Sequence, residues 1–492
     1  MKLNIETYKD KVNACWIGKN IGGTMGTPYE GTREMLDIYG FVTKPGEVLP
    51  NDDLDLQMVW LYALEKEGPY HITASLLGEF WLSFITPHWN EYGLGKINMR
   101  RGLAAPMSGD YENNWKDSNG AWIRTEIWAC VTPGAPEAAA RYAMEDAKVD
   151  HGAGEGTIAA AFVGAMQSAA FVLPDVRSCI EVALSVIPEY SRVAQSVRFV
   201  LEAYDQGMDP KAARNAIQKM NADIGDGWFE APSNVAYTVL GLIYGKGDFK
   251  RSMILAINCG DDTDCTGATV GATMGILGGM AAIPTDWKEY LGDDIVTISI
   301  ARGDQGRSLP NSCTELTSRV VRLAAGTLIA NEADMELSPT GPSEIPGNAK
   351  DLLMRRIRED RRLQAALAGL KPYSLYFETP LYEAFVTLKE APDIRPLEEC
   401  SIHIDFVNKT HRHENEPLNL SLRWLLPEGF HVVSGKSAIR INQENNHSKA
   451  HLGRADFVIA AGETVQPVNR LILEAVTEGR PTILYIPITL LG

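Results

Sequence analysis

Two clusters of acidic residues stand out, and they lie far apart in the sequence. The first directly precedes the apolar segment 57–65 and consists of Asn51, Asp52, Asp53 and Asp55. The second directly precedes the Gly- and Ala-rich segment 267–282 and consists of Asp261, Asp262, Thr263 and Asp264. Each cluster alone has a simple explanation, because an Asp at a helix start caps free N–H groups and suits the positive end of the helix dipole.

The two clusters together favour a metal centre. Capping needs a single carboxylate, and neighbouring carboxylates repel one another unless a cation compensates. The segment after the second cluster is so apolar that it is expected deep in the fold, where a bare carboxylate is costly. Oxygen ligands from Asp, with Asn or Thr beside them and no His at ligand spacing, suit Mg²⁺, Mn²⁺ or Ca²⁺ better than zinc.

Helices must position these clusters. Apolar residues recur at spacings of three and four from residue 8 to about 330, as in Leu56, Val59, Trp60 and Ala63, which predicts helices with one apolar face. Glycines at four-residue spacing, Gly18, Gly22 and Gly26, would let the backbones of two helices approach closely. The region therefore reads as a large, tightly packed all-α bundle.

The pattern changes to alternating β-branched segments from about residue 373, at 401–407, 418–426 and 482–491. These predict an antiparallel β-sandwich, immunoglobulin-like only in its strand spacing. A charged amphipathic helix is expected over 350–370, after three prolines at 339, 342 and 346. We therefore expect a multidomain α plus β chain with an all-α domain at 1–335, a linker and charged helix at 336–372, and a β-sandwich at 373–492.

Composition excludes several classes of protein. The chain has 492 residues and a net charge of −17, which disfavours binding to nucleic acid or to an anionic membrane as its main task. No apolar run approaches about 20 residues and no signal-peptide core is visible at the start, so a cytoplasmic location is expected. The seven cysteines form no CxxC pair, which gives little support to structural zinc or a disulfide framework.

Six segments in order resemble the motifs of the ADP-ribosylglycohydrolase family, of the dinitrogenase reductase-activating glycohydrolase type. They are GKNIGGTMGTPYEG (18–31), NDD (51–53), NGAWIR (119–124), DHGAGEG (150–156), GDDTDCTGATVGA (260–272) and IPTDW (283–287). The resemblance spans roughly residues 8–330. It implies an all-α bundle with two Mg²⁺ ions, Mn²⁺ being an alternative, that cleaves the bond between C1 of the distal ribose and an attached group.

The resemblance also implies roles for single residues. The metal ligands it implies are Asn51, Asp52, Asp53, Asp262, Asp264 and Cys265. Glu30 and Asp262 are the expected catalytic residues: Glu30 is the general acid/base candidate, and either carboxylate could take a proton from metal-bound water. Asn51 replaces the usual Ser or Thr, and Cys265 stands where many members have Thr. Because a thiol is a poor partner for Mg²⁺, either one ion is weaker here, or Thr263, Thr266 or water completes its shell.

Four further residues are expected to bind substrate: Gly120, Trp122, Arg124 and His151. His151 lies in a Gly-rich segment that we expect to begin a helix, where backbone N–H groups can face a phosphate. The alternative is a histidine bonded to the backbone. Arg124 could neutralise a phosphate or pair with a carboxylate, and Trp122 could stack on a base or belong to the core.

The resulting hypothesis is a bacterial Mg-dependent hydrolase that acts on a small-molecule or protein-linked ADP-ribosyl substrate, or on a related ribosylated one. Two alternatives stay open: a non-catalytic protein of the same fold that binds a nucleotide-like ligand or another partner, and a hydrolase of another glycosylated small molecule. The β domain could shape the site, make a dimer contact in a homo-oligomer, or present the enzyme to a macromolecular substrate.

Overall fold

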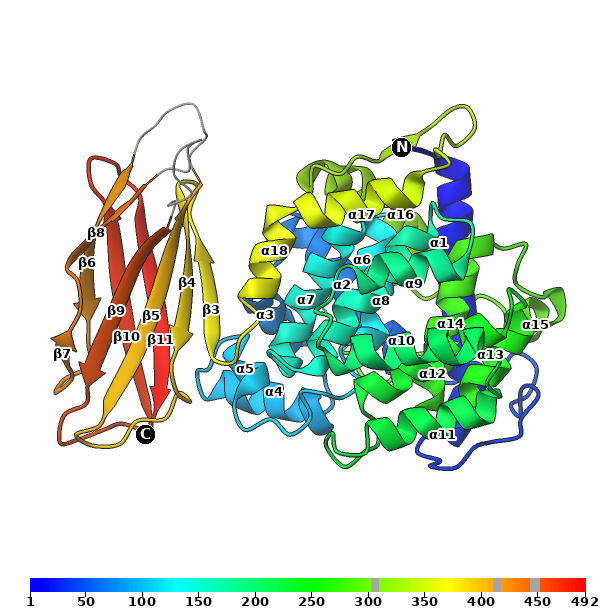
Figure 1. The fold of residues 1–492 in the computed structure, drawn as a ribbon, viewed down its shortest axis with the longest axis horizontal. Helices are drawn as coiled ribbons and strands as arrows, with labels where there is room; N and C mark the ends of the chain where they lie inside the picture. The colour runs from blue at the N-terminus through cyan, green and yellow to red at the C-terminus, as the bar shows by residue number, and fades with distance from the viewer. Residues whose placement is uncertain (302–308, 410–416, 443–451) are drawn as a thin grey trace. The chain divides into compact units, whose positions relative to one another are not determined.

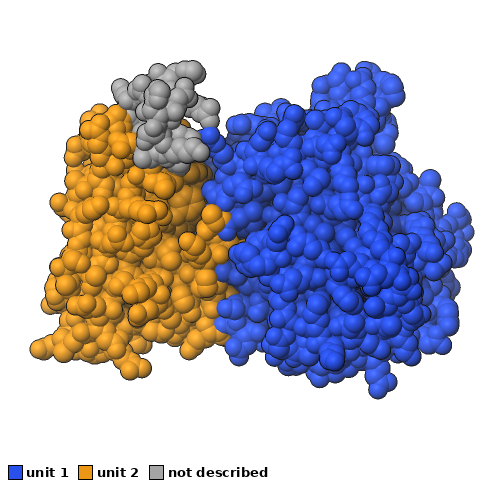
Figure 2. All heavy atoms as spheres, viewed as in Figure 1, with its two compact units in different colours: residues 1–93, 113–367 blue, residues 94–112, 368–492 orange. Residues whose placement is uncertain are grey.

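The computed structural model describes residues 1–301, 309–409, 417–442 and 452–492. Figure 1 shows helices followed along the chain by antiparallel strands, which confirms the expected combination of a helical bundle and C-terminal sheets. None of the helices in these ranges is both long and apolar enough to cross a membrane. Two compact units make up the chain: residues 1–93 with 113–367, and residues 94–112 with 368–492 (Figure 2).

The first unit holds most of the helices, whereas α5 (Met107–Asp110) and most of α4 (Asn90–Arg100) belong to the second. The helices up to residue 170 are α1 (Ile5–Gly26), η1 (Thr27–Tyr29), α2 (Asp52–Glu67), α3 (Ala74–Phe84), α4 (Asn90–Arg100), α5 (Met107–Asp110), η2 (Trp122–Arg124), α6 (Glu126–Val131), α7 (Pro136–His151) and α8 (Glu155–Ala170). Those that follow are α9 (Val176–Leu184), α10 (Arg192–Asp205), α11 (Pro210–Met220), α12 (Ala231–Tyr244), α13 (Phe249–Ile257), α14 (Thr263–Gly278), α15 (Thr285–Leu291), α16 (Cys313–Ala330), α17 (Ala349–Glu359) and α18 (Arg361–Ala368). A short parallel pair, β1 (Lys2–Asn4) with β2 (Glu336–Ser338), joins the two ends of this region.

Helices α1 and α14 pack backbone against backbone, as the glycine spacing predicts. A Cβ on Gly22 would lie 2.0 Å from the carbonyl oxygen of Gly267, and one on Gly18 would lie 2.1 Å from that of Gly271. Only glycine permits this approach. Because Gly26 meets Thr263 while Gly18 meets Gly271, the two helices run antiparallel, and the end of α1 lies at the start of α14.

A single helix was expected over 350–370, but the structure has two, α17 and α18. The prediction of one continuous helix was therefore wrong. The break falls at Asp360, whose Oδ1 accepts a hydrogen bond from the backbone N–H of Leu363 at 2.7 Å. That bond is the one an N-cap residue makes to the first turn of a new helix. Asp360 therefore ends the periodic pattern of one helix and starts the next.

The second unit contains two antiparallel sheets. The strands are β3 (Ser374–Glu378), β4 (Tyr382–Leu388), β5 (Glu399–Asn408), β6 (Leu418–Leu425), β7 (His431–Ser434), β8 (Ala438–Ile441), β9 (Leu452–Ala460), β10 (Val468–Thr477) and β11 (Ile483–Leu491). The order is β11-β10-β6-β8 in one sheet and β3-β4-β5-β9-β7 in the other. Inward residues of both sheets share one apolar core, with side chains alternating along β4 and β10 as period-two strands require.

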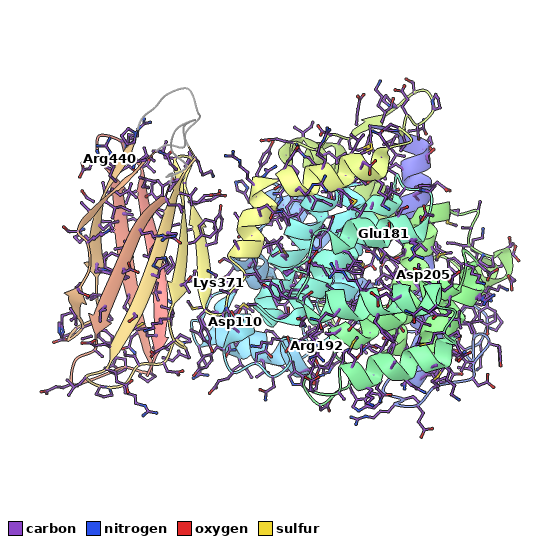
Figure 3. The ribbon with its side chains drawn as sticks, in the orientation of Figure 1. Asp110, Glu181, Arg192, Asp205, Lys371 and Arg440 are labelled. Atoms are coloured by element: carbon purple, nitrogen blue, oxygen red, sulfur yellow. The ribbon has the colours of Figure 1, made fainter. Side chains whose placement is uncertain are left out.

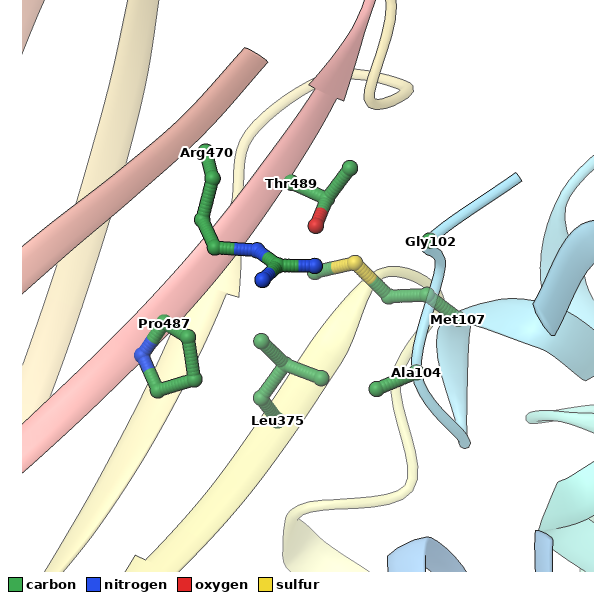
Figure 4. Close-up of a pocket in the computed structure, with 7 residues that line it drawn as sticks. All are labelled: Gly102, Ala104, Met107, Leu375, Arg470, Pro487 and Thr489. Carbon is green, nitrogen blue, oxygen red and sulfur yellow. The ribbon is translucent and has the colours of Figure 1, made fainter. Parts of the chain in front are cut away.

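Residues 94–112 belong to this second unit, although more than 250 residues separate them from its other part, residues 368–492. Leu103, Met107 and Tyr111 are part of its core, and the Tyr111 hydroxyl donates to Asp393 at 2.6 Å. A pocket of about 180 Å³ lies between this segment and the strands, where Met107, Leu375 and Arg470 line it (Figure 4). Sequence patterns gave no sign of this packing.

Candidate metal centre

The first acidic cluster forms the start of α2. Asn51 is the N-cap residue, and its Oδ1 accepts the backbone N–H of Asp53 at 2.7 Å. Asp52 accepts a hydrogen bond from the hydroxyl of Tyr92 at 2.7 Å. Asp55 forms its hydrogen bonds elsewhere. Its Oδ2 accepts the backbone N–H groups of Ile298 and Ser299 at 2.6 and 2.7 Å. Asp55 therefore anchors a loop.

The second cluster forms the turn into α14. Asp261 has a positive φ of 68°, and its carboxylate accepts the side-chain amide of Asn234 at 2.9 Å. That carboxylate also accepts the N–H of Phe229, so Asp261 is fully engaged in holding the turn. Asp262 accepts the amide of Asn119 at 2.7 Å. Asp262 and Asp264 are both more than nine-tenths buried.

The antiparallel contact of α1 and α14 brings the two clusters together. Glu30 follows the end of α1, and its carboxylate lies with those of Asp262 and Asp264 so that one oxygen of each is within 4.8 Å of the others. A second group has the same closeness and consists of Asp53, Asp264 and the thiol of Cys265. Asp264 belongs to both groups, so Asp53 of the first cluster and Asp262 and Asp264 of the second lie in adjoining groups.

Burial makes this arrangement costly without a cation. Asp262 Oδ1 and Asp264 Oδ1 are buried, and neither has a hydrogen-bond partner among the described residues. Burial together with the charge of Glu30 raises the pKa of Asp262 to about 8, and burial with the charge of Asp262 raises the pKa of Asp264 well above its usual value. Free oxygens of neighbouring buried carboxylates fit a hard divalent cation. The residues present thus suit the metal that the sequence predicts.

Glu30 is the exposed member of the centre. Burial of its carboxyl group and the charge of Asp52 raise its pKa above the usual value. A carboxyl group that reaches solvent and whose pKa lies above its usual value suits general acid and base chemistry. The structure therefore puts the expected catalytic pair, Glu30 and Asp262, in one group.

A lysine that the sequence did not point to lies behind Asp53. The Lys19 ammonium, on α1, is 3.4 Å from Asp53 Oδ1 and 3.2 Å from Glu126 Oε2, and it donates to the carbonyl of Ile123 at 2.7 Å. Its side chain is only 1% exposed. Tyr92 was missed as well, because nothing in its local sequence marks it. Asn119 lies in the motif segment NGAWIR (119–124), so the sequence marks its neighbourhood but not its bond to Asp262.

The four residues expected to bind substrate lie close to Asn119 but are buried. Trp122 is fully buried and its indole N–H donates to Asn119 Oδ1 at 3.0 Å, so the ring orients the amide that holds Asp262. A Cβ on Gly120 would lie 2.1 Å from Glu91 Oε1. The role of Gly120 and Trp122 toward a substrate stays a prediction.

Arg124 pairs with carboxylates, which is one of the two alternatives that the sequence left open for it. It donates to Asp146 at 2.9 Å and to Asp150 at 2.7 Å, and its guanidinium lies 4.7 Å from the centroid of the Trp81 ring. The side chain is fully buried. Its donors thus serve the core around η2 and α7.

The segment 150–156 begins a helix as expected, because α8 starts at Glu155, but His151 itself belongs to the preceding helix. It is the last residue of α7, and Gly152 follows with a φ of 49° before α8 starts at Glu155. Its Nδ1 lies 2.9 Å from Asp150 Oδ1 and its Nε2 lies 3.2 Å from the hydroxyl of Ser118. The glycines after His151 end one helix, and the ring is fully buried.

The chain is similar to a known family and to several known proteins. The family described as ADP-ribosylglycohydrolase matches residues 4–321. An uncharacterized protein of Archaeoglobus fulgidus is 26% identical over 303 residues, which are 58% of this chain and 92% of that protein. A solved structure described as an ADP-ribosylglycohydrolase-related protein complex is 19% identical, with a TM-score of 0.44, and covers 65% of this chain and 99% of its own. A FixG-related protein from Vibrio parahaemolyticus covers 23% of this chain at 10% identity and a TM-score of 0.18.

Proposed function

Because the chain belongs to the ADP-ribosylglycohydrolase family, we propose that it is a divalent-metal-dependent hydrolase that cleaves a glycosidic bond at the ribose of an ADP-ribosyl or related ribosylated substrate. One observation carries the metal dependence. Asp262 and Asp264 each keep a buried carboxylate oxygen that has no partner among the residues the structure describes, and both lie beside Glu30. Such oxygens are satisfied by a hard cation.

The residues that would hold the cation are Glu30, Asp262 and Asp264, and Asp53 and Cys265 form the adjoining group. Asp52 lies close enough to Glu30 for its charge to act on that carboxyl group, and Asn51 caps the helix that begins at Asp52. A bound Mg²⁺ or Mn²⁺ supplies positive charge that orients sugar hydroxyls and makes water more acidic. Hydrogen bonds within the chain hold two of these carboxylates in position. Asn119 fixes Asp262, and the Tyr92 hydroxyl fixes Asp52.

The chemistry we propose is the addition of water to C1 of the ribose. The bond between the water oxygen and C1 forms as the bond from C1 to the attached group breaks, and a proton passes to the departing group. Glu30 is the proposed proton carrier, since its carboxyl group is the exposed one of the centre and can exchange protons with solvent. In this proposal the carboxylates of the centre also stabilise the positive charge that develops at C1 of the ribose ring.

An assay separates this function from its alternatives. Purified protein is incubated with ADP-ribosylated proteins, O-acetyl-ADP-ribose and nucleosides, each with Mg²⁺ and with EDTA. Release of the attached group from an ADP-ribosyl substrate with Mg²⁺ alone supports the proposal. Turnover of only another ribosylated compound indicates a different glycoside substrate, and saturable binding without turnover indicates a non-catalytic binding protein.

A further inference from the structure

We propose that Lys19 is a permanent cation of the metal centre, and that the centre therefore binds one divalent ion tightly, through Glu30, Asp262 and Asp264. This inference rests on the proposed function. It departs from the two-ion expectation that follows from the family motifs. It assigns different tasks to the two groups of carboxylates that share Asp264.

Lys19 is held in one position by the chain itself. Its ammonium has three acceptors, which are the carbonyl of Ile123, Glu126 Oε2 and Asp53 Oδ1. A buried ammonium with all three donors engaged is a fixed charge rather than a mobile one. The positive charge beside Asp53 is thus present whether or not a metal is bound.

Glu126, the other carboxylate beside Lys19, is fixed by neutral donors. The side-chain amide of Gln57 donates to its Oε2 at 2.8 Å, and that of Gln167 donates to its Oε1 at 2.9 Å. Hydrogen bonds of this kind stabilise an ionised carboxylate in the interior. Glu126 has no place in either candidate metal group.

Asp53 has little left to offer to an ion. Its Oδ1 faces Lys19, and the Cys265 thiol approaches its Oδ2 at 3.6 Å. Its side chain is also fully buried. Any ion between Asp53, Asp264 and Cys265 would meet a carboxylate already facing an ammonium and a sulfur ligand, which hard cations bind poorly.

The group with Glu30 has the opposite character. Asp262 Oδ1 and Asp264 Oδ1 are buried without a partner in the described part of the chain, and Asn119 holds Asp262 by its other oxygen. All three side chains offer oxygen, and Glu30 connects the group to solvent. Because Asp264 can give its free oxygen to this group, the ion is expected here.

The inference is tested by counting ions in the full chain. Protein freed of metal is loaded with Mn²⁺, desalted and measured by metal analysis, and the titration is repeated by calorimetry. We expect one Mn²⁺ per chain, retained in Asp53→Asn with affinity changed less than about tenfold, and lost in Asp262→Asn. About tenfold is the lower limit for removing a group that directly supports a metal ligand.

Lys19→Met tests the role of the ammonium, with Lys11→Met as the matched control. Lys11 is also on α1 and its ammonium donates to the carbonyls of Ala170, Phe171 and Leu277, none of them in the centre. We expect Lys19→Met to bind a second Mn²⁺ and Lys11→Met to bind one. If Lys19→Met does not fold, the number of Mn²⁺ ions bound by the wild type and by Asp53→Asn still tests the inference.

The outcomes separate this inference from the proposed function. Two tight ions in the wild type, or loss of an ion in Asp53→Asn, would overturn the role of Lys19 while leaving a metal-dependent hydrolase. No bound ion in the wild type would contradict the proposed function itself.

Discussion

The side-chain amide of Asn119 donates a hydrogen bond of 2.7 Å to Asp262, a residue 143 positions further along the chain. This bond links the segment 119–124 to the start of α14. It occupies Oδ2 and leaves Oδ1 of Asp262 with no partner within the described ranges of the chain. Asn119 therefore decides which oxygen of Asp262 is available to a cation.

The first prediction concerns this bond. Asn119→Ala should weaken Mn²⁺ binding by about 10- to 100-fold, the range found when a group that orients a metal ligand is removed. Calorimetric titration of the purified variant measures it. The control is Asn331→Ala, because Asn331 is equally buried but bonds to Tyr142 and Thr327. Equal affinity in the wild type and Asn119→Ala would contradict the role assigned to Asn119.

The second prediction concerns pH. The pKa of Asp262 is about 8 in the metal-free fold, against 3.8 for a free side chain, so the folded state binds this proton more tightly than the unfolded state. Metal-free stability should therefore fall as the pH rises between about 4 and 8. A cation binds the deprotonated form, so its stabilising effect should grow over the same range.

Thermal unfolding with and without Mg²⁺ measures this effect. The rise in Tm on adding Mg²⁺ should be larger at pH 8.5 than at pH 6. In Asp262→Asn the Tm should no longer respond to Mg²⁺ at either pH. A response that is larger at pH 6 would be evidence against metal binding at this carboxylate.

The third prediction concerns the contact of α1 with α14. Gly22→Ala should destabilise the protein by about 1–3 kcal/mol or more, because the added methyl group overlaps the backbone of α14. Gly326→Ala is the matched control, since Gly326 is an exposed glycine inside α16 with no atom within 4 Å of its would-be Cβ. That change should stabilise by up to about 1 kcal/mol.

Urea unfolding of the two variants checks this pair. Opposite signs of the change in free energy of unfolding are expected. If Gly22→Ala were as stable as Gly326→Ala, the close approach that brings Glu30 to Asp262 would not be a property of the protein in solution.

The fourth prediction concerns Arg124. Arg124→Ala should cost about 3–5 kcal/mol of stability, since it leaves Asp146 and Asp150 buried without their partner. The control is Arg177→Ala on α9. Arg177 pairs with Asp205, labelled in Figure 3, in an ion pair exposed to solvent, so its loss should cost at most about 1 kcal/mol. Chemical denaturation of both variants compares them. Similar losses would show that burial of Arg124 matters less than the structure indicates.

Much of the fold could be predicted because its signals are local. The spacing of Gly18, Gly22 and Gly26 indicates a close helix contact, and the alternation within 401–407, 418–426 and 482–491 matches β5, β6 and β11. The break at Asp360 was hidden, because a cap residue can occur inside an unbroken apolar period. The place of residues 94–112 was also hidden, since it depends on packing against strands much later in the chain.

The candidate site was predictable to a similar extent. The acidic clusters can be recognised in the sequence because several carboxylates directly precede apolar segments. The antiparallel contact of α1 with α14 brings the two clusters close together. Lys19 and Tyr92 carry no such signal, because a lysine in one helix and a tyrosine in another become relevant only through tertiary contacts. The glycines of segment 150–156 indicate a helix start, which α8 provides at Glu155, but they do not show that His151 ends the preceding helix α7.

The most direct test of metal-dependent hydrolysis compares the wild type with Asp262→Ala, measuring bound Mg²⁺ and turnover of an ADP-ribosyl substrate on the same preparations. We predict that the wild type retains Mg²⁺ and releases the attached group, that EDTA abolishes this and added Mg²⁺ restores it, and that Asp262→Ala has neither metal nor activity. Full activity in Asp262→Ala, or undiminished activity of the wild type in EDTA, would contradict the account.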